Sequence, residues 1–266
     1  MPQFPRRVVC LTEETTETLY AIGADHLIVG VSGFTVRPQR ARKEKPTVST
    51  YLDAKFDNII ALRPDVVFAW SDLQADICAE LIRRGVEVVC FNHRSIDGIL
   101  SMIVKLGAFV GYHDQAHAYA LALRVRVDEA ARVGSLRTFK PRVYFEEWYD
   151  PIITGICWVS ELIEVCGGID VFAENRQHQG AKERIVADPL EVVRRDPDVM
   201  IASWCGKMFK PERVRARQGW ESFRPTVNNM LFDIPSPIIL QPGPAALTDG
   251  IDAITNILSV VPARTP

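Results

Sequence analysis

The chain has 266 residues, enough for one large domain or two smaller ones. Hydrophobic residues make up 47% of it and the formal net charge is -2, which excludes a disordered chain and a general electrostatic attraction to nucleic acid. The chain contains no run of about 18 apolar residues, so no transmembrane helix and no membrane insertion are expected.

The N-terminus enters an apolar strand, Val8–Leu11, almost at once, without the longer apolar stretch of a secretory signal. Six cysteines lie far apart, mostly in apolar runs where a thiol acts as a small hydrophobe. Both features favour a reduced, cytoplasmic protein over a disulfide scaffold. A periplasmic protein from which the signal has been removed is the alternative.

Strand and helix patterns alternate along most of the chain. The first part predicts strands at 7–11, 27–31, 65–69 and 86–91 and helices at 15–22, 53–62, 73–84 and 95–110. From Gly111 to about Val133, apolar residues recur at three- and four-residue spacing, which predicts one long helix of roughly 22 residues. The last part predicts strands at 142–147, 198–202 and 230–234 and helices at 158–166, 188–195, 211–217 and 244–260.

The same order of predicted elements occurs twice in the chain. Ile59–Trp70 reads as a helix end, a Pro-Asp turn, an apolar strand and a tryptophan, and Val192–Trp204 repeats this order. The strand that starts at Arg7 has its counterpart at Arg142, 135 residues later. The prolines of the first pair, Pro64 and Pro197, are 133 residues apart. We therefore predict two α/β lobes of the same design.

The predicted architecture is two Rossmann-like lobes with mainly parallel sheets, at 1–110 and 135–266, joined by a spine helix at 111–134. Because ligands of open α/β sheets bind outside the carboxyl ends of the strands, we expect a ligand cleft between the lobes.

Aromatic residues are concentrated in the loops that follow predicted strands. Such rings give flat surfaces for a large ring system, although each could instead pack the junction between lobes. The five rings are Phe34, Tyr51, Trp70, Trp148 and Trp204.

Paired acids occupy matching places in the two halves, Glu13-Glu14 and Glu146-Glu147. They could bind a cationic group or a metal, or act as an acid/base pair. Helix capping with surface solvation is the alternative.

Other polar residues of these loops complete the candidate ligand site. Cys205 lies beside Lys207, which would lower a thiol pKa, although an inert wall residue is the commoner outcome. Arg37 and Asp72 follow strands of the first half, and Gln241 precedes the proline-rich entry to the last helix.

The chain resembles the helical-backbone periplasmic binding proteins, the substrate-binding subunits of cobalamin and siderophore ABC transporters. The resemblance covers nearly the full chain and rests most specifically on Ile60–Trp70, with support from Arg7–Leu11, Val48–Tyr51, Leu162–Gly168 and Arg195–Ile201. It implies two lobes on one long helix, and places Tyr51, Trp70 and Phe34 at ring positions of a corrin pocket. It also places Asp76, with Glu212 or Glu221, where family members dock onto a transporter. The chain is similar to a subgroup without a signal peptide.

The main hypothesis is a monomeric solute-binding protein, not an enzyme, that needs no cofactor. It would capture a corrinoid, or else a haem-like or metal-siderophore ligand, with an ABC transporter permease as a possible partner. The alternative is a cytosolic enzyme or metallochaperone that uses the paired glutamates with Cys205 and Lys207. A ligand sensor acting through a protein partner is a third possibility.

Overall fold

The computed structural model describes residues 4–264. Contacts divide the chain into two compact units. Unit 1 comprises residues 1–93, 97–124 and 242–244, and unit 2 comprises residues 94–96, 125–241 and 245–266. One boundary between the units therefore lies inside the long central helix. The sequence-based prediction had treated this helix, 111–134, as a separate linker between the lobes.

Unit 1 is built on a parallel sheet in the order β3-β2-β1-β4-β5. The strands are short, and all except β3 are mostly apolar, as expected for strands covered on both faces. The sequence predicted four of these strands and missed β3, a three-residue strand. Their bounds are β1 (Val8–Cys10), β2 (Ile28–Ser32), β3 (Thr47–Ser49), β4 (Val66–Trp70) and β5 (Val88–Phe91).

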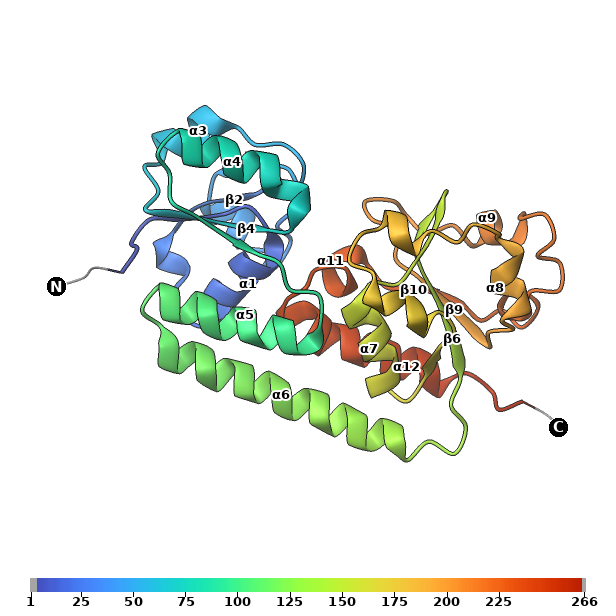
Figure 1. Cartoon of the computed structure of the whole chain (residues 1–266). Helices are drawn as coiled ribbons and strands as arrows, with labels where there is room; N and C mark the ends of the chain where they lie inside the picture. Colours follow the sequence, from blue (N-terminus) through green and yellow to red (C-terminus); the bar gives the residue numbers. More distant parts are fainter. Residues whose placement is uncertain (1–3, 265–266) are drawn as a thin grey trace. The chain divides into compact units, whose positions relative to one another are not determined.

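Helices cover both faces of this sheet (Figure 1). One face packs Val9 and Val67 against α3 (Phe56–Ala61) and α4 (Ala75–Arg83), through side chains such as Leu81. The opposite face carries α1 (Glu13–Ala21) and α5 (Ile96–Phe109). The short helix α2 (Ala41–Glu44) lies in the connection between β2 and β3.

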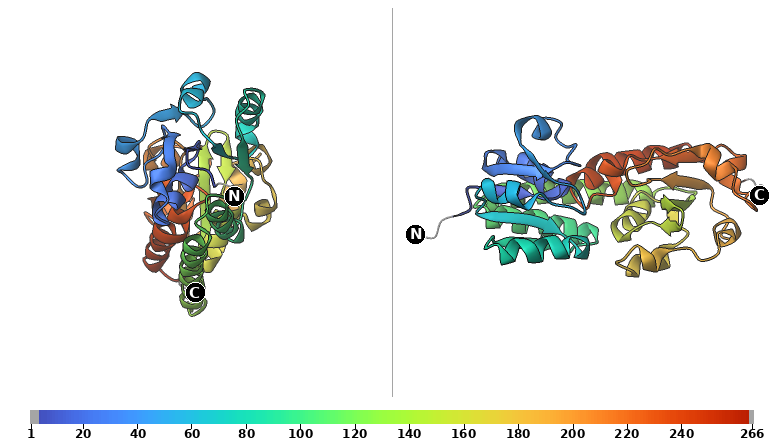
Figure 2. Two further views of the ribbon diagram at one scale, coloured as in Figure 1. Left: turned by 90° about the vertical axis from the view of Figure 1, so that its left-hand side faces the viewer. Right: turned by 90° about the horizontal axis from the view of Figure 1, so that it is seen from above.

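The long helix α6 (His113–Ser135) is found close to its predicted position, and in unit 1 it lies alongside α5 (Figures 1 and 2). The two helices approach closely at Gly107, where an added Cβ would lie 2.1 Å from the Cβ of Ala116. Glycine is therefore needed at this crossing because its neighbour leaves no room for a side chain.

Unit 2 has a sheet in the order β10-β9-β6-β7, with β8 also pairing β6. The pairs β10–β9, β9–β6 and β6–β8 are parallel, and β7 is antiparallel. The strands β6, β9 and β10 were predicted, whereas β7 and β8 were not. Their bounds are β6 (Arg142–Tyr149), β7 (Ile152–Thr154), β8 (Ile169–Asp170), β9 (Val199–Ala202) and β10 (Leu231–Asp233).

Two sets of helices cover the unit 2 sheet (Figure 1). One face packs Tyr144 and Met200 against a core that includes Val192, Val214 and Trp220. Alternation along the strands turns Val143 and Phe145 to the other face. The helices are α7 (Cys157–Val165), α8 (Leu190–Arg194), α9 (Pro211–Arg215), α10 (Arg224–Val227), α11 (Ser236–Ile239) and α12 (Ile251–Ser259), the last preceded by a π-helical turn, Ala246–Gly250.

The internal repeat is visible in backbone detail. Arg63 and Asp196, the residues before the two repeated prolines, both have a left-handed φ of 45°. The aspartates that follow have the same role: a carboxylate oxygen of Asp65 accepts the backbone N–H of Arg7, at 2.9 Å, and one of Asp198 accepts that of Arg142, at 2.8 Å. Such matching capping contacts confirm that the two units share one plan.

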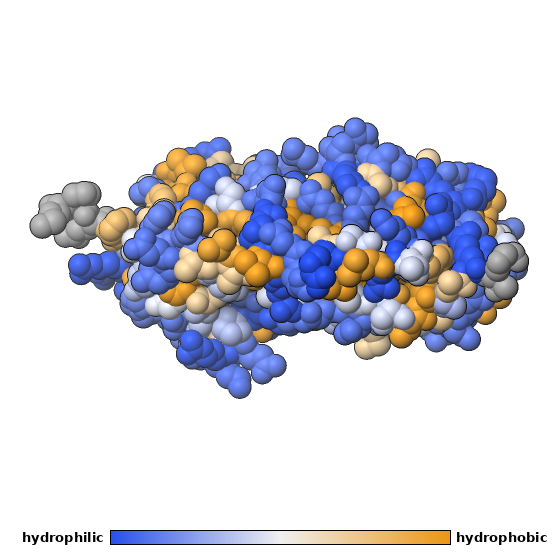
Figure 3. All heavy atoms as spheres, turned by 90° about the horizontal axis from the view of Figure 1, so that it is seen from below, coloured by the Kyte–Doolittle hydropathy of each residue, from blue (hydrophilic) through white to orange (hydrophobic). Residues whose placement is uncertain are grey.

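No helix within residues 4–264 is long and apolar enough to cross a membrane. Helix α6 does expose apolar side chains, among them Leu121, Val125 and Val133. On the face seen in Figure 3, apolar atoms are interrupted by hydrophilic ones. That face therefore carries no single large apolar patch.

Candidate functional site

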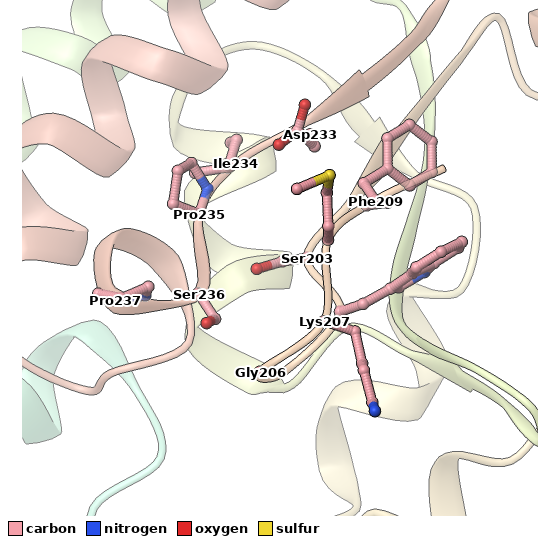
Figure 4. A pocket seen from close by; sticks show the side chains of 12 residues that line it. Ser203, Gly206, Lys207, Phe209, Asp233, Ile234, Pro235, Ser236 and Pro237 are labelled. Atoms are coloured by element: carbon pink, nitrogen blue, oxygen red, sulfur yellow. The ribbon is translucent and has the colours of Figure 1, made fainter. Parts of the chain in front are cut away.

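A pocket of about 320 Å³ lies in unit 2 where β9 and β10 end (Figure 4). The hydroxyl of Ser203 points into it, is buried, and has no hydrogen-bond partner within the described part of the chain. Ser236 adds a second hydroxyl, and the side chain of Lys207 extends away from the pocket. Asp233 adds a carboxylate to the wall. The other side chains of the lining are mainly apolar: Ala202, Trp204, Met208, Phe209, Ile234, Pro235 and Pro237.

A chain of aromatic rings continues from the pocket wall. Phe209 meets Trp204 with ring centroids 5.0 Å apart, Trp204 meets Tyr149 at 4.6 Å, and Tyr149 meets Trp148 at 5.0 Å. The guanidinium of Arg213 lies 4.9 Å from the Tyr149 ring centroid. Trp204 is buried and Trp148 is half-buried, so the chain runs from the core to the surface.

Glu146 anchors this aromatic chain from inside the core. Its carboxylate accepts hydrogen bonds from Trp204 Nε1 at 3.0 Å and from the Tyr144 hydroxyl at 2.6 Å. Arg217 donates to both carboxylate oxygens, at 2.7 and 2.8 Å. The expected direct contact of Glu146 with ligand does not fit this position, because the side chain is fully buried and both oxygens are occupied. The residue holds Trp204 in place instead.

Glu147 forms an ion pair with Arg184, with contacts of 2.6 and 3.1 Å. Arg184 is almost fully buried and also donates to the carbonyl of Thr154. Glu147 therefore compensates a buried cation, which differs from the expected role in binding a ligand.

Cys205 and Lys207 lie in the exposed turn that follows β9, and Gln241 is half-buried. The expected docking acids Asp76, Glu212 and Glu221 are all exposed. They lie in the first turn of α4, in α9 and just before α10, and Glu221 accepts the backbone N–H of Gly219 at 3.2 Å.

In unit 1, the predicted rings differ in exposure. Phe34 is 50% exposed and Tyr51 is half-buried, whereas Trp70 is buried at the end of β4. Trp70 Nε1 donates to the carbonyl of His93 at 3.2 Å, and its ring centroid lies 6.4 Å from that of Tyr51. Trp70 is therefore a supporting residue behind the more exposed rings.

The polar residues of the same edge are also engaged. Arg37 pairs with Glu17 at 2.9 Å, and Asp72 is exposed at the start of a short 3-10 turn. The amide of Gln74 donates to the carbonyl of Tyr51, at 3.1 Å, and so holds the loop after β3.

Glu13 and Glu14 are buried in the first turn of α1. Burial, with the neighbouring Glu14 charge as the next cause, raises the pKa of Glu13 to about 8. Burial likewise raises the pKa of Glu14 to about 7, although a hydrogen bond from Thr12 opposes the shift. Both side chains are buried, so the surface solvation in the predicted alternative is wrong, whereas both acids do lie in the first turn of α1.

Residues 4–264 contain no group of three or more His, Cys, Asp or Glu side chains arranged to hold a metal ion. The two acid pairs lie in different units, Glu13-Glu14 in unit 1 and Glu146-Glu147 in unit 2.

Sequence reasoning missed Arg217, Arg184 and Ser203. The two arginines lie 71 and 37 residues from the acids they pair with, so no local pattern joins them. Ser203 could have been found, because it comes directly after the apolar strand β9, where ligand contacts are expected.

The strand-end pocket and the repeated α/β units agree with a match to the family model described as "Periplasmic binding protein", over residues 8–238. The chain belongs to the periplasmic binding protein family. A curated relative, the vitamin B12-binding protein of Yersinia pseudotuberculosis, is 29% identical over 220 residues, covering 79% of this chain and 78% of the relative.

Solved structures show the same fold as this binding protein. The periplasmic vitamin B12-binding protein BtuF of Vibrio cholerae matches with a TM-score of 0.77 and 21% identity, covering 98% of this chain and 99% of that one. A periplasmic haem-binding protein from Pseudomonas aeruginosa matches with a TM-score of 0.81 and 19% identity, covering 98% and 95%. At these identities the structures establish the fold alone.

Proposed function

We propose that the protein captures one small ligand with a large ring system, in the first place a corrinoid. The family consists of solute-binding proteins, and the curated relative is named for vitamin B12. We also propose that the ligand is cargo rather than a resident cofactor, and that the protein is a monomer without enzymatic activity.

The observation that carries the proposal is the aromatic chain beside the unit 2 pocket. Trp148, Tyr149, Trp204 and Phe209 are in ring contact, and Glu146 fixes the orientation of Trp204. Rigid rings beside a mostly apolar pocket suit a flat ligand, since little side-chain entropy is lost on binding.

A haem-like ligand is the second candidate. Met208 lines the pocket and is 81% exposed. A thioether is a ligand that haem iron accepts, and a structural neighbour is named for haem binding.

Compartment and partner follow from the proposed role. The neighbours are named periplasmic proteins, so we propose a place outside the cytoplasm rather than the cytoplasmic one that the cysteine pattern favoured. An ABC transporter would be the partner, with Asp76 and Glu212 or Glu221 as exposed docking acids.

Absorbance titration with cyanocobalamin and with haemin tests the proposal directly. We expect a saturable change at one equivalent of cyanocobalamin, and at least a tenfold weaker affinity in Tyr149→Ala and Phe209→Ala, about 1.4 kcal/mol each. Phe4→Ala, an exposed ring before β1, is the control and should bind normally. A haem-like ligand would be favoured if the wild type binds haemin but not cyanocobalamin and Met208→Ala no longer binds haemin. No response to either compound would refute both.

A further inference from the structure

The acid pair of unit 1 is buried without a compensating charge. Glu13 is 6% exposed and Glu14 is 1% exposed. One carboxyl oxygen of each, Oε2, has no hydrogen-bond partner within residues 4–264. An ionised carboxylate in such a place is costly unless it is paired, so the surroundings favour the neutral acids.

The charged groups around the pair do not remove this cost. Glu17, on the same helix, adds a further negative charge, and its own partner is Arg37, at 2.9 Å. The positive charge of Arg42 lowers the pKa of Glu13, but by less than burial, Glu14 and Glu17 raise it. Cys90 is also no compensating group for Glu14, since a thiol carries no positive charge. The pair therefore sits in a region that favours bound protons at neutral pH.

A loop from the C-terminal part of the chain rests on this pair. Pro242–Pro244 belongs to unit 1, although Gln241 and Ala245 belong to unit 2. An added Cβ on Gly243 would lie 2.4 Å from the Cβ of Glu14, so the loop backbone packs directly on the Glu14 side chain. A ring nitrogen of His93, Nε2, lies 2.7 Å from the carbonyl oxygen of Pro242 and gives the loop a second contact.

We propose that Glu13 and Glu14 form a proton-controlled seat for the loop Pro242–Pro244, which stays packed while the acids are neutral and lifts when they ionise. Ionised carboxylates need hydration or a cation. Because the loop backbone packs on Glu14, hydration of an ionised Glu14 favours a displaced loop. Loop position and proton occupancy are therefore linked, and each shifts the equilibrium of the other by the same factor.

Burial raises the pKa of the two acids to about 8 and about 7, so the transition falls between neutral and mildly alkaline pH. The loop supplies no titratable side chain of its own, because it consists of two prolines and one glycine. His93 is the titratable group that contacts it, and a variant at this position separates its contribution.

Hydrogen exchange of the full-length protein without ligand tests the seat. We would measure protection of the amides of Gly243 and Ala245 from pH 6 to pH 9, corrected for intrinsic exchange rates, with β10 as the internal reference. We expect protection to fall by about tenfold or more as the acids ionise, since one pKa unit corresponds to a tenfold change in an equilibrium. Protection that stays constant over this range in the wild type would overturn the proposal.

Three variants sharpen the test. Glu13→Gln/Glu14→Gln keeps the neutral form, so its protection should be high at every pH, and Glu14→Gln alone replaces it if the double variant does not fold. Gly243→Ala should lower protection at every pH by forcing the loop off Glu14. His93→Gln should lower protection while leaving its dependence on pH intact. If Glu13→Gln/Glu14→Gln keeps the pH transition of the wild type, ionisation of these acids does not control the loop. Because no ligand is present, the result is independent of whether a corrinoid binds.

Discussion

Glu146 joins three side chains that are widely separated in the sequence. Tyr144 precedes it by two residues on β6, whereas Trp204 and Arg217 follow 58 and 71 residues later. Alternation along a strand places Tyr144 and Glu146 on one face, the face that packs on Trp220 and Val214. The alternation along β6 therefore already indicated that Glu146 points into the core with Tyr144.

Replacement of Glu146 should reveal the cost of leaving Arg217 without its partner. We expect Glu146→Gln to lower the free energy of unfolding by about 3–5 kcal/mol, as for other broken buried ion pairs. Urea denaturation provides the measurement. Glu129→Gln is the matched control, because its pair with Arg132 is exposed and should change stability by about 0.5 kcal/mol or less. Equal effects of the two substitutions would contradict the buried network.

Single residues were the least predictable level. The sequence placed Glu13, Trp70 and Trp204 near strand ends, which is where they lie. It could not show that Glu14 and Trp204 are buried, because burial depends on segments such as α9 and the loop at Gly243 that come from distant parts of the chain.

Secondary-structure elements were more predictable, since each carries its own periodicity. The long helix α6 and the strands β4 and β9 follow from local patterns of apolar residues and prolines. β1 and β10 are only three residues long, but they lie in apolar segments that extend beyond them and were predicted. β3 was missed because it has a single apolar residue, and β7 because only Asp150 and Pro151 separate it from β6. The close contact between α5 and α6 was also not predicted, because a single glycine, Gly107, is a weak signal in the sequence.

The contact between α5 and α6 predicts a steric effect at Gly107. Gly107→Ala would place a Cβ 2.1 Å from that of Ala116 and 3.0 Å from the Tyr112 carbonyl oxygen, so the helices must separate. We expect a loss of about 1–3 kcal/mol, measured by urea denaturation. The added substitution Ala116→Gly should recover part of it. Gly180→Ala meets only ordinary contacts and serves as the control. An unchanged stability in Gly107→Ala would contradict the close crossing.

For the whole molecule, the buried acids set the dependence of stability on pH. Glu13, Glu14 and Asp170 all have a raised pKa, chiefly because of burial. The folded state therefore binds more protons than the unfolded state between the ordinary carboxyl pKa, about 4, and the raised values. The stability that these groups contribute is present at low pH and is lost as pH rises through the folded pKa.

We accordingly expect the free energy of unfolding to fall between about pH 5 and pH 8 and then to level off. Urea denaturation at several pH values measures this slope. Glu13→Gln/Glu14→Gln should flatten it, since the substituted groups no longer titrate, and the variant should be the more stable protein at pH 8. A wild-type stability that rises toward pH 8 would show that the acids are paired in solution.

The six cysteines should differ strongly in reactivity. Burial raises the pKa of Cys10 to about 12 and that of Cys166 to about 11, whereas Cys90 and Cys205 are exposed. Because the thiolate is the reactive form, we expect two thiols per chain to react rapidly with Ellman's reagent in the folded protein. Cys90→Ser and Cys205→Ser should each remove one rapid equivalent, and six rapid equivalents in the folded protein would contradict the burial.

The positions of these two thiols have a practical consequence. Cys90 belongs to unit 1 and Cys205 to unit 2. A donor and an acceptor fluorophore attached to them would therefore measure the distance between the units by energy transfer. The natural sequence already supplies both attachment points. Energy transfer between single dye pairs would then report how the separation of the units responds to ligand and to pH, molecule by molecule.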